Sequence, residues 1–163
     1  MLLDYSIRYS ILCDRIDELY KVIEFKRESK LSEEFTEDFQ KYLFLLSVLD
    51  GDISTKEVNT INFILGTSWT GIEIKKYIET NNIYSEEFMK KNPESIKKII
   101  KLEAKIENKQ LFDCISDLYE GTALLFSNDE RQDDFSEDYV MMFRKYNFDY
   151  RRSLGEKNNA CGR

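Results

Sequence analysis

The chain has 163 residues, with 24 Lys and Arg against 31 Asp and Glu, no histidine and three cysteines, so its net charge is −7. A chain of this length fits one domain with a substantial hydrophobic core. The lack of histidine excludes Ser-His-Asp and Cys-His nucleophilic catalysis and the zinc sites that use histidine. One proline, six glycines and 42% hydrophobic residues favour long regular elements over disorder or a turn-rich β sandwich.

The first apolar residues and the cysteines bear on compartment. Asp4 and Arg8 interrupt the apolar start of the chain, so we expect no secretory signal. No window approaches about 18 uncharged apolar residues, so no membrane-spanning helix is expected. Cys13, Cys114 and Cys161 are scattered and lack CxxC spacing, which is typical of reduced thiols. These features predict a cytoplasmic protein that does not associate with a membrane.

The charge is unevenly placed along the chain. Residues 127–138 carry six acids and one arginine, giving −5, whereas residues 90–109 carry seven lysines and three glutamates, giving +4. These lysines lack interleaved arginines and a nucleic-acid motif, and a polyanion would repel a chain of net charge −7. The pattern therefore disfavours nucleic-acid binding.

The first two elements are expected to be helices. From Tyr5 onwards, apolar residues recur every three or four positions, which predicts a helix over residues 2–28. Ser32, followed by two glutamates, is typical of a helix N-cap. The second helix is expected to end at Asp50-Gly51.

Two shorter helices are predicted from their capping residues. Ser54 and Glu57 have the S-x-x-E spacing of a capping box, in which each side chain accepts a backbone N–H of the other residue. Gly66 is expected to end this third helix. Thr70 and Glu73 repeat the spacing and open a fourth helix.

A basic helix is predicted in the second half of the chain. Ser85 is expected to cap a single turn, and Pro93 to occupy the first position of the following long helix. Isoleucines are expected on one face of that helix and lysines on the other. A break near Asn108 separates it from a further helix with its own apolar stripe.

The whole pattern predicts an all-α fold. No segment alternates as a strand would, and a last helix is expected over residues 136–146. We therefore expect a single-domain bundle of seven to eight helices over residues 1–150, followed by a flexible C-terminal tail over residues 151–163.

A tight acidic turn is the most informative short motif. Asp50, Asp52 and Glu57 surround a helix-loop-helix turn, and clustered carboxylates suit a hard cation such as calcium or magnesium. An EF-hand is excluded, because with Gly51 at the sixth loop position the first and third positions fall on apolar residues. The alternative is structural: Gly51 for a positive φ angle and Glu57 for the capping box.

This turn and the apolar segment before it, residues 42–48, resemble the tellurite-resistance TerB-like helical family, whose members carry a D-G-x-I-s-x-x-E turn between two core helices. Residues 82–88 and 93–95 resemble the TerB-like regions joined to or encoded beside AAA-type ATPases in Firmicutes. The resemblance covers roughly residues 35–146. It implies an all-helical TerB-like domain and an AAA-type ATPase as the protein partner.

The resemblance also implies which acids would hold a cation. In the first turn they are Asp50, Asp52 and Glu57. A second copy of the turn is matched at residues 133–136, although it departs from the family pattern in having Asp129-Glu130 in place of Asp-Gly. In that copy the implied ligands are Asp129, Asp133 and Asp134.

Two groups of residues are candidates for contact with a partner. Trp69 lies in a predicted loop, and tryptophan is enriched among binding hot spots. The alternative is that its ring packs on the core. Glu130, Glu137 and Asp138 belong to the acidic segment, which would meet a basic surface.

These observations lead to two functional hypotheses. The first is a non-catalytic cytosolic protein-interaction module of TerB-like type that binds a divalent cation, calcium or magnesium, at its acidic turns. The alternative is an acidic immunity protein that neutralises a basic toxin by direct binding. The chain has neither GxxxxGK[ST] nor GxGxxG, so nucleotide hydrolysis would belong to a partner. An enzymatic role would require a carboxylate-bound metal that activates water.

Overall fold

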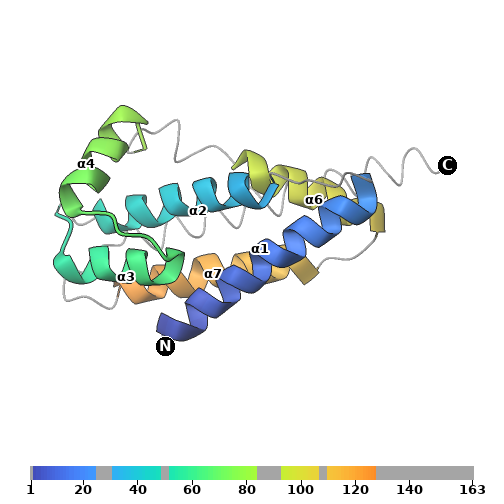
Figure 1. Cartoon of the computed structure of the whole chain (residues 1–163), viewed down its shortest axis with the longest axis horizontal. Coiled ribbons are helices and arrows are strands. Elements are labelled where there is room, and N and C mark those ends of the chain that lie inside the picture. The colour runs from blue at the N-terminus through green and yellow to red at the C-terminus, as the bar shows by residue number, and fades with distance from the viewer. Residues whose placement is uncertain (1, 25–30, 49–51, 84–92, 107–109, 128–163) are drawn as a thin grey trace.

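The computed structural model describes residues 2–24, 31–48, 52–83, 93–106 and 110–127, which form α-helices and no strand (Figure 1). This confirms the all-α prediction for the described part of the chain. The turn at Ser85, the helix over residues 136–146 and the tail over residues 151–163 lie outside the described residues. The six described helices are α1 (Leu2–Glu24), α2 (Leu31–Val48), α3 (Thr55–Leu65), α4 (Gly71–Thr80), α6 (Glu94–Ile106) and α7 (Gln110–Ser127).

Helix α2 forms the centre of the fold and contacts each of the other five described helices. The reason lies in its second half, where residues 42–47 are buried on every side of the helix. A helix that is apolar all round must be enclosed by other elements. Helix α1 crosses the bundle obliquely and packs on α2, α3, α6 and α7 (Figure 1).

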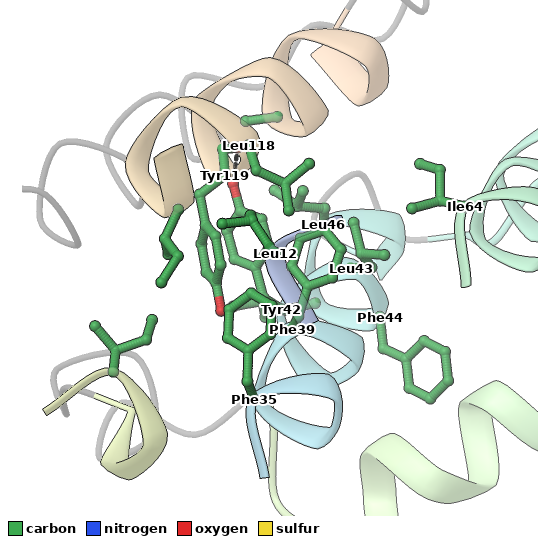
Figure 2. Close-up of a cluster of buried hydrophobic side chains, with 14 of the residues drawn as sticks. Leu12, Phe35, Phe39, Tyr42, Leu43, Phe44, Leu46, Ile64, Leu118 and Tyr119 are labelled. Atoms are coloured by element: carbon green, nitrogen blue, oxygen red, sulfur yellow. Dashed lines mark hydrogen bonds between the residues drawn. The ribbon is translucent and has the colours of Figure 1, made fainter. Parts of the chain in front are cut away.

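Stacked aromatic rings join α2 to α7 and α1. The Phe39 ring stacks on that of Tyr42 in the same helix, with centroids 6.2 Å apart (Figure 2). It also stacks on Tyr9 of α1, with centroids 5.6 Å apart. Tyr42 stacks on Tyr119 of α7 at 4.2 Å, and its hydroxyl donates to the Tyr119 carbonyl oxygen at 2.6 Å. Such ring pairs contribute about 0.5–1.5 kcal/mol each beyond the area they bury.

The predicted ends of α3 are confirmed. The Glu57 N–H donates to Ser54 Oγ at 3.1 Å and the Ser54 N–H donates to Glu57 Oε1 at 2.9 Å, so the capping box is complete. Gly66 ends the helix in the left-handed region, with φ of 67°. At α4 only half of the predicted box forms, because the Thr70 hydroxyl, and not its amide, donates to Glu73 Oε1.

Two predicted helix starts need correction. Ser32 is not an N-cap, because α2 already begins at Leu31 and the Ser32 hydroxyl donates to Asp17 Oδ2 of α1 at 2.8 Å. Pro93 lies one residue before α6, and its carbonyl oxygen accepts the Lys97 N–H at 3.1 Å. None of the described helices is both long and apolar enough to cross a membrane.

Candidate functional site

The acids of the first turn have separate partners. The Asp52 side chain is 82% exposed and lies 3.9 Å from Lys75 Nζ of α4. Glu57 is only 6% exposed, and its Oε1 atom accepts the Ser54 N–H. Asp50 lies outside the described residues. The structure therefore assigns a helix-capping role to Glu57, as the structural alternative proposed.

The other predicted cation ligands and acidic contact residues cannot be placed. Asp129, Asp133 and Asp134, together with Glu130, Glu137 and Asp138, lie outside the described residues. Within the described ranges, no three Asp, Glu or Cys side chains gather as a metal site would require. The cation site stays a prediction.

Trp69 packs against the bundle. Its ring lies edge-on to Phe44 and Tyr77, with centroids 5.3 and 5.7 Å away, and its Nε1–H donates to Gln40 Oε1 at 3.2 Å. The Asn62 side chain holds the backbone of the same loop, donating to the Trp69 carbonyl and accepting the Trp69 N–H, both at 2.8 Å. This geometry favours the alternative of a tryptophan folded onto the core.

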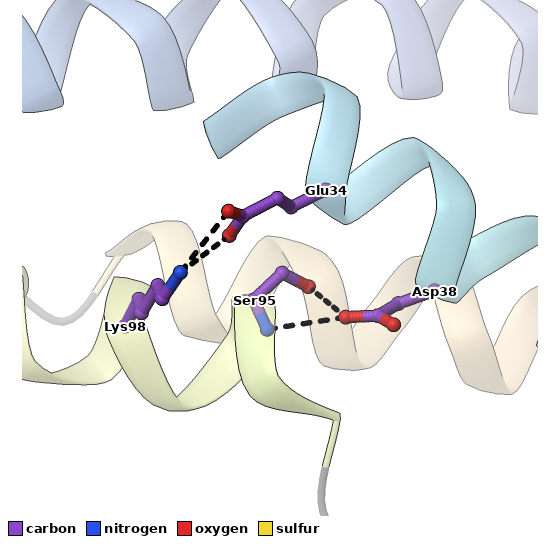
Figure 3. A network of polar contacts seen from close by, with 4 residues as sticks. All are labelled: Glu34, Asp38, Ser95 and Lys98. Carbon is purple, nitrogen blue, oxygen red and sulfur yellow. Dashed lines mark hydrogen bonds and ion pairs between the residues drawn. The ribbon is translucent and has the colours of Figure 1, made fainter. Parts of the chain in front are cut away.

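Asp38 is a site that sequence reasoning missed. From the middle of α2, its Oδ2 atom accepts the N–H of Ser95 at 3.1 Å and also the Ser95 hydroxyl, at the start of α6 (Figure 3). Burial raises the pKa of Asp38, while the hydrogen bonds from Ser95 and the nearby charge of Lys41 oppose that rise. The sequence carries no signal of this contact, because the two residues are 57 positions apart.

An exposed ion pair accompanies the Asp38 contact. Lys98 Nζ of α6 lies 2.8 Å from Glu34 Oε2 of α2, and the hydrogen bond to Glu34 raises the pKa of Lys98 (Figure 3). Exposed pairs of this kind contribute little stability on their own. The pair and the Asp38 contact both join α2 to the N-terminal half of α6.

Glu103 is a second acid that sequence reasoning missed. It is 4% exposed, and its Oε1 atom accepts the Phe112 N–H at 2.7 Å in the first turn of α7. Glu103 therefore has the same structural role as Asp38 and Glu57. Each accepts a backbone N–H where a helix begins, which satisfies donors that the helix itself leaves unpaired.

The two predicted faces of α6 are confirmed. Ile96, Ile99 and Ile100 are buried, whereas Lys101 and Lys105 are exposed. This helix therefore presents positive charge on the outside of a molecule whose net charge is −7.

The thiol of Cys13 lies in a small polar cluster between α1 and α2. The hydroxyls of Tyr9 and Thr36 are 2.6 Å apart, and Cys13 Sγ is 3.7 Å from Thr36 Oγ1. Burial raises the pKa of Cys13 and raises that of Tyr9 to about 12. A thiol with a raised pKa is a poor nucleophile at neutral pH, which fits a packing role.

Searches of protein-family models, curated proteins and solved structures find no match to this chain.

Proposed function

We propose that the chain is a non-catalytic protein-interaction module, with a TerB-like arrangement of seven to eight helices. The observation that carries this proposal is the use of one half-buried and two buried acids. Asp38, Glu57 and Glu103 each accept a backbone N–H at a helix start. An acid held in this way stabilises the start of a helix. The proposed function therefore lies on the exposed charged surfaces.

The partner surface that we propose is the acidic segment, residues 127–138, with Glu130, Glu137 and Asp138 as contact residues. Its charge of −5 would attract a basic surface and speed the encounter with it. The resemblance to TerB-like regions points to an AAA-type ATPase as the protein that carries this surface. The lysines of α6 provide the opposite polarity and would be repelled by the same partner.

A divalent cation is not required by this proposal. Asp52 lies 3.9 Å from Lys75 Nζ and Glu57 Oε1 accepts the Ser54 N–H, so a calcium or magnesium ion bound by these acids and Asp50 would compete with both contacts. Calorimetric titration with each metal tests the site. Heat at millimolar metal that disappears in Asp50→Ala would support it, and no heat would remove it.

The alternative, an immunity protein that neutralises a basic toxin, rests on the same acidic segment. Both hypotheses predict a complex that weakens with salt, so the identity of the captured protein decides between them.

Site-specific photo-cross-linking in cells tests the proposed surface. A photoreactive amino acid is placed singly at position 130, 137 or 101, the last being the matched control on the basic face. We expect one partner protein to be cross-linked from positions 130 and 137 and not from 101. Adducts from 101 alone would contradict the proposal. A basic toxin as the adduct would select the alternative over an ATPase.

A further inference from the structure

We draw no further inference here: the strongest candidate, the exposed apolar row of Leu3, Ile7 and Ile11 on the outer face of α1, has nothing beside it in the described part of the chain that shows what covers it.

Discussion

At the residue scale, Ser54 fixes the start of α3 with a single oxygen. Its Oγ atom accepts the Glu57 N–H at 3.1 Å. Ser54→Ala removes that acceptor, so we expect the free energy of unfolding to fall by about 1 kcal/mol. Urea denaturation measures the loss. Thr55→Ala, at the next and exposed position, is the matched control, and an equal loss in the control would contradict the capping role.

Asp38 has a pH dependence that follows from its burial. Its folded-state pKa is raised by burial, so the folded protein binds the proton more tightly than the unfolded chain does. The stability of the wild type relative to Asp38→Asn should therefore rise as the pH falls from neutral toward about 4, and be lost again as the pH rises.

Denaturation of both proteins at several pH values measures this difference. The exposed change Asp117→Asn on α7 controls for a change of net charge. If the wild type instead loses stability on acidification relative to Asp38→Asn, the hydrogen bonds from Ser95 outweigh burial and the assigned pKa direction is wrong.

At the scale of elements, the sequence correctly predicted the helix ends and helix faces that depend on contacts between residues close together in the chain. The capping box of α3, its end at Gly66 and the two faces of α6 all involve residues at most a few turns apart. The start of α2 was predicted wrongly because Asp17, on another helix, holds the Ser32 hydroxyl. A residue with the sequence pattern of an N-cap can instead form a hydrogen bond with a residue on another helix.

A close approach of α1 and α7 depends on Gly121. A Cβ atom at this position would lie 2.5 Å from Tyr5 Cε1, so the ring occupies the space that a side chain would need. Gly121→Ala should cost about 1–3 kcal/mol in the wild type, because the contact is overpacked. In a Tyr5→Ala background the same change should stabilise by about 1 kcal/mol, because alanine is the better helix former.

A double-mutant cycle, with each variant unfolded in urea, measures this coupling. Equal effects of Gly121→Ala in the two backgrounds would show that Tyr5 does not set the spacing of the helices.

At the scale of the whole molecule, the contacts that assemble the bundle join distant parts of the chain. Asp38 and Ser95 are 57 residues apart, and Tyr42 and Tyr119 are 77 apart. Helical periodicity identifies the buried faces, but not which face meets which. For the same reason the acids at Asp38 and Glu103 carried no sequence signal, whereas Glu57 did, because its partner is three residues away.

The division of acids between fold and surface is the central claim. The buried carboxylates of Glu57 and Glu103 and the half-buried one of Asp38 each accept a backbone N–H at a helix start, and the acidic segment is proposed to bind the partner. The most direct test is the salt dependence of the partner complex, measured by titration calorimetry with the purified cross-linked protein. The proposal predicts that binding weakens steeply with salt and falls at least about tenfold in Glu130→Lys combined with Glu137→Lys, with thermal stability unchanged. Binding that is insensitive to salt and to this charge reversal would contradict it.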